Sequence, residues 1–400
     1  SQLEGFKLTR LITGNSLKYL NSIKVGEAGY EPARELVKFF KIKFDKKEQK
    51  TQIESLLKKQ NIKYFMELIP KDANDMDPAV NPADEGPLYN NQGYLTPAPN
   101  GIDAQCIWNN FPNTVGSPGL TTDFVDLEQG WVLNHEDLPL NPTTSLIVGN
   151  NRHGIGTYLG NHGTAVVGEV AATDNTLGVL GIASGVGTSR VASHYVIASD
   201  GSSSSLNVAA AIVASVPTMK PGDVLLLEVQ RPGAAGPIPV ESNLADFRAI
   251  QLATARGIIV VEAAGNGGNN LNNLSHTGVT GVNTFNRTSS NFMDSGAIMV
   301  GAITSTVPHV RMNIPTHGWG TNFGNRIDCC SWGQNVTTAG YGVAGGASGG
   351  TTSYTNTFNG TSSASPIIVG AVLLIQSYCK NYLGISITPQ QMRTILQNPA

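Results

Sequence analysis

The chain has 400 residues, of which 40% are hydrophobic, and its formal net charge is −3. This length suggests two or three domains of about 150 residues each, and the apolar content excludes a wholly disordered chain. The near-neutral charge excludes a protein that binds nucleic acid by bulk electrostatics. The longest apolar run, Pro366–Ile375, is well short of the ~18 residues of a membrane span, so we expect no membrane span.

Charge divides the chain into two regions. Residues 1–71 carry 13 of the 15 lysines and a net charge of +7, whereas the remainder carries −10. This shift in composition predicts a basic α+β domain with the start of a linker over residues 1–85, a linker over 86–100 and a main domain over 101–400. Opposite charges favour docking of the two domains; the alternative is a solvated basic face without a partner.

The basic region shows the pattern of a small β–α–β unit. The second half of Glu31–Phe44 alternates apolar and basic residues, which indicates a strand, and Gln52–Gln60 has apolar residues at helical spacing. Ile62–Ile69 is expected to form a second strand. The Pro- and Asn-rich residues Asp72–Pro99 are expected to run over a surface as a linker.

In the main domain, short apolar runs alternate with Ala-rich helical stretches. This pattern predicts an α/β fold with a mostly parallel sheet flanked by helices. In such sheets, functional groups gather beyond the carboxyl ends of the strands. The expected strands are Leu120–Val125, Gly222–Leu227 and Ile258–Ala263, and the expected helices are Ala165–Ala172, Leu206–Val216, Asn243–Arg256, Ile367–Tyr378 and Pro389–Leu396.

Three polar residues stand at such places in the chain. Asp126 ends an expected strand, His162 precedes an expected helix and Ser362 precedes another. Each alone has an ordinary structural explanation, because Asp is common in turns and Ser is a common helix cap. The order acid, histidine, serine nevertheless matches a known arrangement for nucleophilic catalysis.

Together with their neighbours, these residues resemble the subtilisin-like serine peptidases. The resemblance covers about residues 101–399. It is carried by Gly-Thr-Ser-x-Ala-x-Pro around Ser362, by Asn161–Gly168 around His162, by Ala263-Ala264-Gly265-Asn266, by Asn175–Ala183 and by His135-Glu136-Asp137-Leu138.

The resemblance implies a catalytic role for four residues. Ser362 would be the nucleophile, His162 the base that takes its proton, and Asp126 the acid that orients the imidazole. Asp123 is the alternative acid, but it lies within the expected strand. Asn266 would donate its side-chain amide to the oxyanion; its other explanation is a left-handed turn residue.

The resemblance also implies a cleft in which a protein or peptide substrate binds as an added strand. The matching segments are Gly201, Ser202 and Ser203 on one side and Glu228, Val229 and Gln230 on the other. The second segment departs from the family's Ser-Leu-Gly-Gly pattern because larger polar residues replace small ones. These side chains would narrow the specificity pocket or favour a polar or basic substrate; alternatively, Glu228 pairs with Arg231 at the rim.

A structural calcium ion is implied by a further match. Its ligands would be the side chains of Asp137 and Asn175 and the carbonyl oxygens of Thr173, Leu177 and Val179, which suit a hard cation. The alternative is a loop closed by hydrogen bonds alone. No organic cofactor is expected. The four cysteines (Cys106, Cys329, Cys330 and Cys379) lack the spacing of a zinc site, and their pairing is left open.

These matches predict a serine endopeptidase, secreted or periplasmic, whose N-terminal domain acts as a propeptide; a cytoplasmic location is the alternative. Two other functions stay open: a peptide ligase or macrocyclase that uses the same acyl-enzyme, and a catalytically silent binding or scaffold protein. The family's catalytic domains usually continue beyond the helix at Pro389–Leu396 into a strand and a helix. The catalytic domain is therefore expected to lack these two elements.

Overall fold

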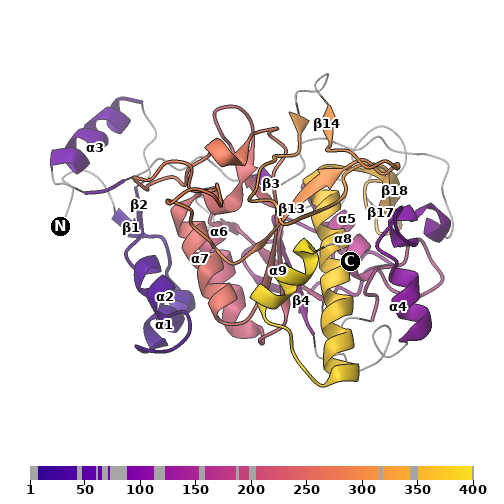
Figure 1. Ribbon diagram of the computed structural model, residues 1–400. Coiled ribbons are helices and arrows are strands. Elements are labelled where there is room, and N and C mark those ends of the chain that lie inside the picture. Colours follow the sequence, from indigo (N-terminus) through magenta and orange to yellow (C-terminus); the bar gives the residue numbers. More distant parts are fainter. Residues whose placement is uncertain are drawn as a thin grey trace.

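A parallel sheet covered by helices on both faces forms the centre of the structure (Figure 1). The computed structural model describes residues 8–42, 47–59, 62–64, 71–72, 88–111, 122–152, 158–185, 189–197, 204–314, 319–342 and 350–398. The α-helices in these ranges are α1 (Gly14–Ser22), α2 (Tyr30–Leu36), α3 (Lys47–Lys59), α4 (Ala104–Asn110), α5 (Tyr158–Ala171), α6 (Val208–Ser215), α7 (Leu244–Ala255), α8 (Thr361–Tyr378) and α9 (Pro389–Gln397).

The central sheet has seven strands in the order β16-β13-β12-β9-β4-β6-β5, and all neighbours run parallel. The expected α/β fold class is therefore confirmed. The bounds of these strands are β4 (Phe124–Glu128), β5 (Leu146–Val148), β6 (Ser189–Ser193), β9 (Val224–Leu227), β12 (Ile259–Ala263), β13 (Ile298–Ile303) and β16 (Cys329–Trp332).

Shorter antiparallel strands lie around this sheet. β10 (Val229–Arg231) follows β9 closely and pairs with both β11 (Ile238–Pro239) and β3 (Lys71–Asp72). The remaining pairs are β1 (Leu8–Arg10) with β2 (Phe40–Ile42), β7 (Tyr195–Ile197) with β8 (Ser204–Leu206), β14 (Asn313–Ile314) with β15 (Trp319–Gly320), and β17 (Val336–Ala339) with β18 (Tyr354–Phe358).

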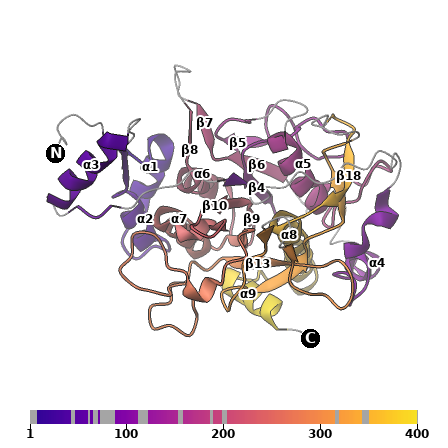
Figure 2. The ribbon, with the colours of Figure 1, turned by 90° about the horizontal axis from the view of Figure 1, so that it is seen from above.

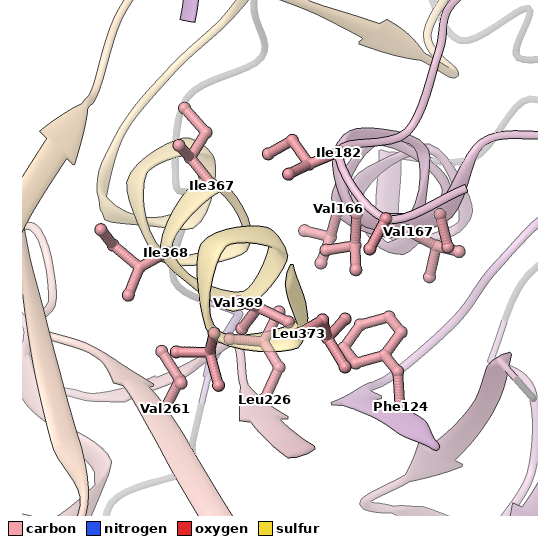
Figure 3. Close-up of a cluster of buried hydrophobic side chains, with 14 of the residues drawn as sticks. Phe124, Val166, Val167, Ile182, Leu226, Val261, Ile367, Ile368, Val369 and Leu373 are labelled. Carbon is pink, nitrogen blue, oxygen red and sulfur yellow. The ribbon is translucent and has the colours of Figure 1, made fainter. Parts of the chain in front are cut away.

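One face of the sheet packs against α5 and α8 (Figure 3). Phe124, Leu226 and Val261, from β4, β9 and β12, are fully buried in one cluster with Val369 and Leu373 of α8. Truncating a side chain of this kind to alanine typically costs about 2–5 kcal/mol. This packing therefore fixes α8, whose first turn carries Ser362, against the middle of the sheet.

The opposite face packs against α6, α7 and the N-terminal helices. Because side chains alternate along a strand, Val125, Leu225 and Val260 point to this face and join its cluster. Leu20 of α1 and Leu36 of α2 are fully buried in the same cluster. Both ribbon views show these indigo helices beside α6 and α7 (Figures 1 and 2). The basic N-terminal region is thus docked through apolar side chains, whereas the sequence suggested opposite charges.

The N-terminal region differs in detail from the expected β–α–β unit. The first strand is short, Phe40–Ile42, because α2 occupies the chain up to Leu36. α3 starts at Lys47 and buries Ile53 and Leu57. Of the expected strand Ile62–Ile69, residues 62–64 form no strand, and residues 65–69 lie outside the described residues.

The residues expected to form a surface linker are instead attached to the main domain from Leu88 onward. The Leu88 amide donates to the Gly178 carbonyl oxygen at 2.6 Å. Gln92 bonds to the backbone of Leu180 at both ends of its side-chain amide, and Tyr94 is fully buried. Within the predicted linker, the residues from Leu88 to Leu95 therefore pack against the main domain. Its proline and asparagine content reflects tight turns on a packed surface.

α8 and the turn after it, Thr361–Leu383, are long and apolar enough to cross a membrane by length and composition alone. Of the apolar window, 83% is buried inside the fold, as expected for the core helix of the sheet. The four cysteines carry no disulfide, since all four lie in described ranges and are free thiols.

Candidate active site

β4 presents two carboxylates at its carboxyl end. Asp126 and Glu128 point to the same side of the strand because they are two residues apart, and both are fully buried. Asp126 Oδ2 accepts a hydrogen bond from Trp131 Nε1 at 2.7 Å. Glu128 Oε2 lies 2.7 Å from His162 Nδ1, and both of these side chains are fully shielded from solvent.

Glu128 therefore stands where the sequence placed Asp126. The prediction ended the strand after Val125, which made Asp126 its terminal acid, but β4 continues to Glu128. The longer strand carries the terminal acid two residues farther, toward α5. Gln129-Gly130 directly after Glu128 is the turn signal that could have marked the true end of the strand.

The helix α5 brings His162 to this carboxylate. Gly163 allows the close approach, because a Cβ there would lie 2.5 Å from the Gly130 carbonyl oxygen and from the Trp131 ring. Thr164 ties the helix to the same turn, since its Oγ1 accepts from the Val132 amide at 2.8 Å. These small residues beside His162 are those that the sequence motif contains.

Ser362 lies in the first turn of α8, which packs against α5. The Ser362 hydroxyl is fully buried and has no hydrogen-bond partner among the described residues. The His162 ring packs edge-on against Phe358, four residues before Ser362, with ring centroids 5.6 Å apart. The packing of α5 against α8 thus places the helix that carries His162 beside the helix that carries Ser362, although the two residues are 200 positions apart in the sequence.

Asn266 follows β12 and contacts the residue before the serine. Its Oδ1 accepts from the Thr361 amide at 2.9 Å and from Thr361 Oγ1 at 3.1 Å. Because the oxygen is held in this way, Nδ2 is fixed as the donor end of the amide. A Cβ at Gly360, where φ is 90°, would lie 3.1 Å from Nδ2, so glycine is required to leave room beside the donor.

The alternative explanation of Asn266 as a left-handed turn residue does not hold. The left-handed conformation belongs to Gly265, with φ of 85°, and Asn266 is not among the residues with positive φ. The backbone N–H groups at the start of α8 have no partner within the helix. The Ser362 amide and Asn266 Nδ2 together have the chemistry of an oxyanion hole.

The segment expected to bind substrate, Glu228–Gln230, directs its side chains into the fold. All three residues are fully buried. The Glu228 carboxyl contacts Ser365 Oγ, and Gln230 Oε1 accepts a hydrogen bond from the backbone N–H of Asn266 at 3.0 Å. Gly201, Ser202 and Ser203 lie outside the described residues.

The suggested rim pair between Glu228 and Arg231 is not what the structure shows. The two residues point to opposite sides of the strand, and Arg231 pairs with Asp246 of α7 at 2.5 Å. The side chains of Glu228 and Gln230 are therefore turned into the fold, and the backbone of β10 pairs with β11 and β3.

The loop expected to hold calcium is closed by hydrogen bonds. Asp137 Oδ2 accepts from the Val179 amide and Asn175 Oδ1 from the Leu177 amide, both at 2.9 Å. The Thr173 amide donates to the Asp137 carbonyl oxygen. Burial raises the pKa of Asp137 to about 7, which is the behaviour of a carboxylate that lacks a compensating charge.

Comparison with known proteins adds to this geometry. A model of the subtilase family matches residues 148–400, which include His162, Asn266 and Ser362 but begin after β4. Subtilisin DY of Bacillus licheniformis is 30% identical over 251 residues, which cover 63% of this chain and 75% of that protein. An extracellular protease of Xanthomonas campestris is 33% identical over 243 residues, which cover 60% of this chain and 36% of that protein.

Proposed function

Because the chain belongs to the subtilase family of serine peptidases, we propose that it cleaves peptide bonds through an acyl-enzyme on Ser362. The observation that carries this proposal is the buried 2.7 Å contact between Glu128 and His162, beside the helix whose first turn holds Ser362. A serine hydroxyl is a weak nucleophile unless a neighbouring base takes its proton. With Nδ1 facing Glu128, Nε2 is the nitrogen that would act as this base.

The other residues would act on charge that develops during the reaction. Glu128 would stabilise the imidazolium that forms when His162 takes the proton. Asn266 Nδ2 and the Ser362 amide would donate to the oxyanion of the tetrahedral intermediate. His162 would then return its proton to the leaving amine, and water would hydrolyse the acyl-enzyme.

Active-site labelling tests this proposal. A fluorophosphonate probe is expected to label Ser362 in the wild type once the N-terminal region has been removed, and Ser362→Ala is expected to abolish the label. Cleavage of a peptide library, read by mass spectrometry, then gives the cleavage preference. Wild type that neither labels nor cleaves under these conditions would overturn the proposal. Transfer products in the presence of an added amine would favour the ligase instead.

We propose further that the N-terminal region is an inhibitory propeptide. Its support is the pairing of β3 with β10, in which Lys71 lies opposite Gln230 and Asp72 opposite Val229. β10 is the segment expected to receive a substrate as an added strand. The chain's own β3 occupies this edge, so a substrate strand would have to displace it.

Processing of the full chain tests the inhibitory role. Incubation of wild type is expected to release the N-terminal region by cleavage in the residues after Asp72, and peptidase activity is expected to rise in step with that cleavage. Ser362→Ala should stay intact under the same conditions, as seen by intact-protein mass. Full activity in an uncut chain would contradict the inhibitory role.

For calcium, the donor set fits in part. Asp137 supplies a buried carboxylate whose charge a divalent cation would compensate, with carbonyl oxygens of residues 173–179 close by. We propose that calcium raises the thermal unfolding temperature and that Asp137→Asn removes most of this response. An unfolding temperature that neither calcium nor a chelator changes would show that hydrogen bonds alone close the loop.

A secreted or periplasmic location is proposed on the similarity to a protein described as an extracellular protease. Fractionation of the native host, with an antibody against the main domain, tests this. Recovery of the protein only in the cytoplasmic fraction would contradict it.

A further inference from the structure

The strand that passes the active site alternates its side chains between two environments. Val229 joins the apolar cluster on the side of α6 and α7, and Arg231 pairs with Asp246 on α7. Because side chains alternate along a strand, Glu228 and Gln230 point the other way, toward α8 and the end of β12. Both are fully buried.

The Glu228 carboxyl reaches the first turns of α8 through Ser365. Ser365 Oγ lies within hydrogen-bond distance of Glu228 Oε1 and, at 2.7 Å, of the Thr361 carbonyl oxygen. A hydroxyl has one proton, and a carbonyl oxygen can only accept. Ser365 therefore stands between the Glu228 carboxyl and the Thr361 carbonyl oxygen, and its hydroxyl proton is donated to one of them or shared between both.

A second buried carboxyl lies near Glu228. Glu169 of α5 is fully buried, and neither of its carboxyl oxygens has a hydrogen-bond partner among the described residues. Burial and the nearby Glu228 raise the pKa of Glu169 well above its usual range. Two neighbouring buried carboxyls are costly to ionise together, and the raised pKa identifies Glu169 as the one that stays neutral.

Gln230 completes the connection to the oxyanion donor. The backbone N–H and the hydroxyl of Thr361 donate to Asn266 Oδ1. The backbone N–H of Asn266 donates to Gln230 Oε1 at 3.0 Å. Hydrogen bonds therefore link Glu228 to Ser365, Ser365 to Thr361, Thr361 to the Asn266 side chain, and the Asn266 backbone to Gln230 on the same strand as Glu228.

We infer that Glu228 and Gln230 are positioning residues that hold Asn266 and the first turn of α8 in the geometry needed to stabilise the oxyanion. The inference rests on the proposed peptidase function. It explains why larger polar residues stand here in place of the small ones of the family pattern. Neither side chain contacts the substrate; both act through Asn266 and Thr361, Glu228 by way of its hydrogen bond with Ser365.

Substitutions at Glu228 distinguish a side chain that acts by hydrogen bonding from one that only fills space. Glu228→Ala is expected to lower kcat roughly 10- to 100-fold with KM changed less than about 3-fold, because small displacements of catalytic groups are costly. Glu228→Gln keeps a hydrogen-bonding amide toward Ser365, and its kcat is expected to stay within about 3-fold of the wild-type kcat. Glu169→Gln is the matched control for a neighbouring buried carboxyl outside the hydrogen-bond path, and it should leave kcat unchanged.

A double-mutant cycle with Asn266 tests whether the effect passes through the oxyanion donor. Asn266→Ala alone is expected to lower kcat ~10²–10³-fold. Glu228→Ala, or Gln230→Met, should then have little further effect in that background. Ser365→Ala is the second variant if Glu228→Ala fails to fold, and it is expected to show the same loss of kcat.

Each result bears on a distinct claim. An unlabelled, inactive wild type refutes the proposed function itself. If the wild type is active, then Glu228→Ala or Ser365→Ala with wild-type kcat, full additivity with Asn266→Ala, or a Glu228→Gln variant as impaired as Glu228→Ala would overturn this inference alone.

Discussion

Replacing Glu128 by glutamine is the most direct test of which acid serves His162. The two side chains lie 2.7 Å apart and are fully shielded from solvent, so water cannot supply the missing charge. Glutamine has nearly the same shape but cannot stabilise an imidazolium by charge. The equivalent loss in a serine peptidase triad lowers kcat about 10⁴-fold, which corresponds to about 5.4 kcal/mol in the activation free energy. We expect a loss of this order for Glu128→Gln.

Asp126→Asn is the matched control, since Asp126 is on the same strand and equally buried. Its contact with Trp131 Nε1 needs only an acceptor oxygen, which asparagine keeps, so kcat is expected to stay within about 3-fold of wild type. The assay is kcat for a peptide substrate over a range of pH, with circular dichroism to confirm folding. A large loss in Asp126→Asn combined with an active Glu128→Gln would refute the assignment of Glu128.

Three further changes should have measurable effects. Leu20→Ala is expected to lower the free energy of unfolding by about 2–5 kcal/mol, because Leu20 is fully buried between the N-terminal helices and α6. Val25→Ala is the control: Val25 is 80% exposed, so this variant should change the free energy of unfolding little in denaturant titrations. Gly360→Ala should lower kcat at least tenfold and also reduce stability, because alanine is strained at a φ of 90° and its Cβ would lie 3.1 Å from Asn266 Nδ2. Unchanged kcat in the folded variant would remove the need for space there. Burial raises the pKa of Asp294, but the hydrogen bonds and charge of Arg393 outweigh this effect and lower the pKa to about 2. The stability that this ion pair contributes is therefore present above about pH 4 and is lost as the pH falls toward 2. Asp294→Asn should flatten that part of an acid unfolding curve, and an unaltered curve would contradict the link.

The sequence allowed the family, the fold class and three members of the proposed catalytic set (His162, Asn266 and Ser362) to be predicted because the signals for them are local. The motif around Ser362 and the small residues after His162 are needed where α8 and α5 approach other backbone, so they are visible as short patterns. The family match, the parallel sheet and the position of α8 agree with those expectations.

Glu128, two residues beyond the predicted acid, contacts His162 because the end of a strand depends on tertiary pairing. Phe124 and Val125 looked like the last apolar pair, but β4 pairs with both β6 and β9 as far as Leu127. The packing of residues in the predicted linker is hidden from the sequence for a similar reason. Its turn-forming composition describes local conformation, and nothing local reveals that Tyr94 inserts into the core.

The two faces of the sheet are completed at different times as the chain is made. α1 and α2 precede the strands of the sheet in the chain and cover the face shared with α6 and α7, whereas α8, which covers the other face, follows all seven of these strands. Until then, the apolar side chains of β4, β9 and β12 on that second face stay open to water and to neighbouring chains. Nascent chains that stop short of α8 are therefore expected to be both inactive and prone to aggregate.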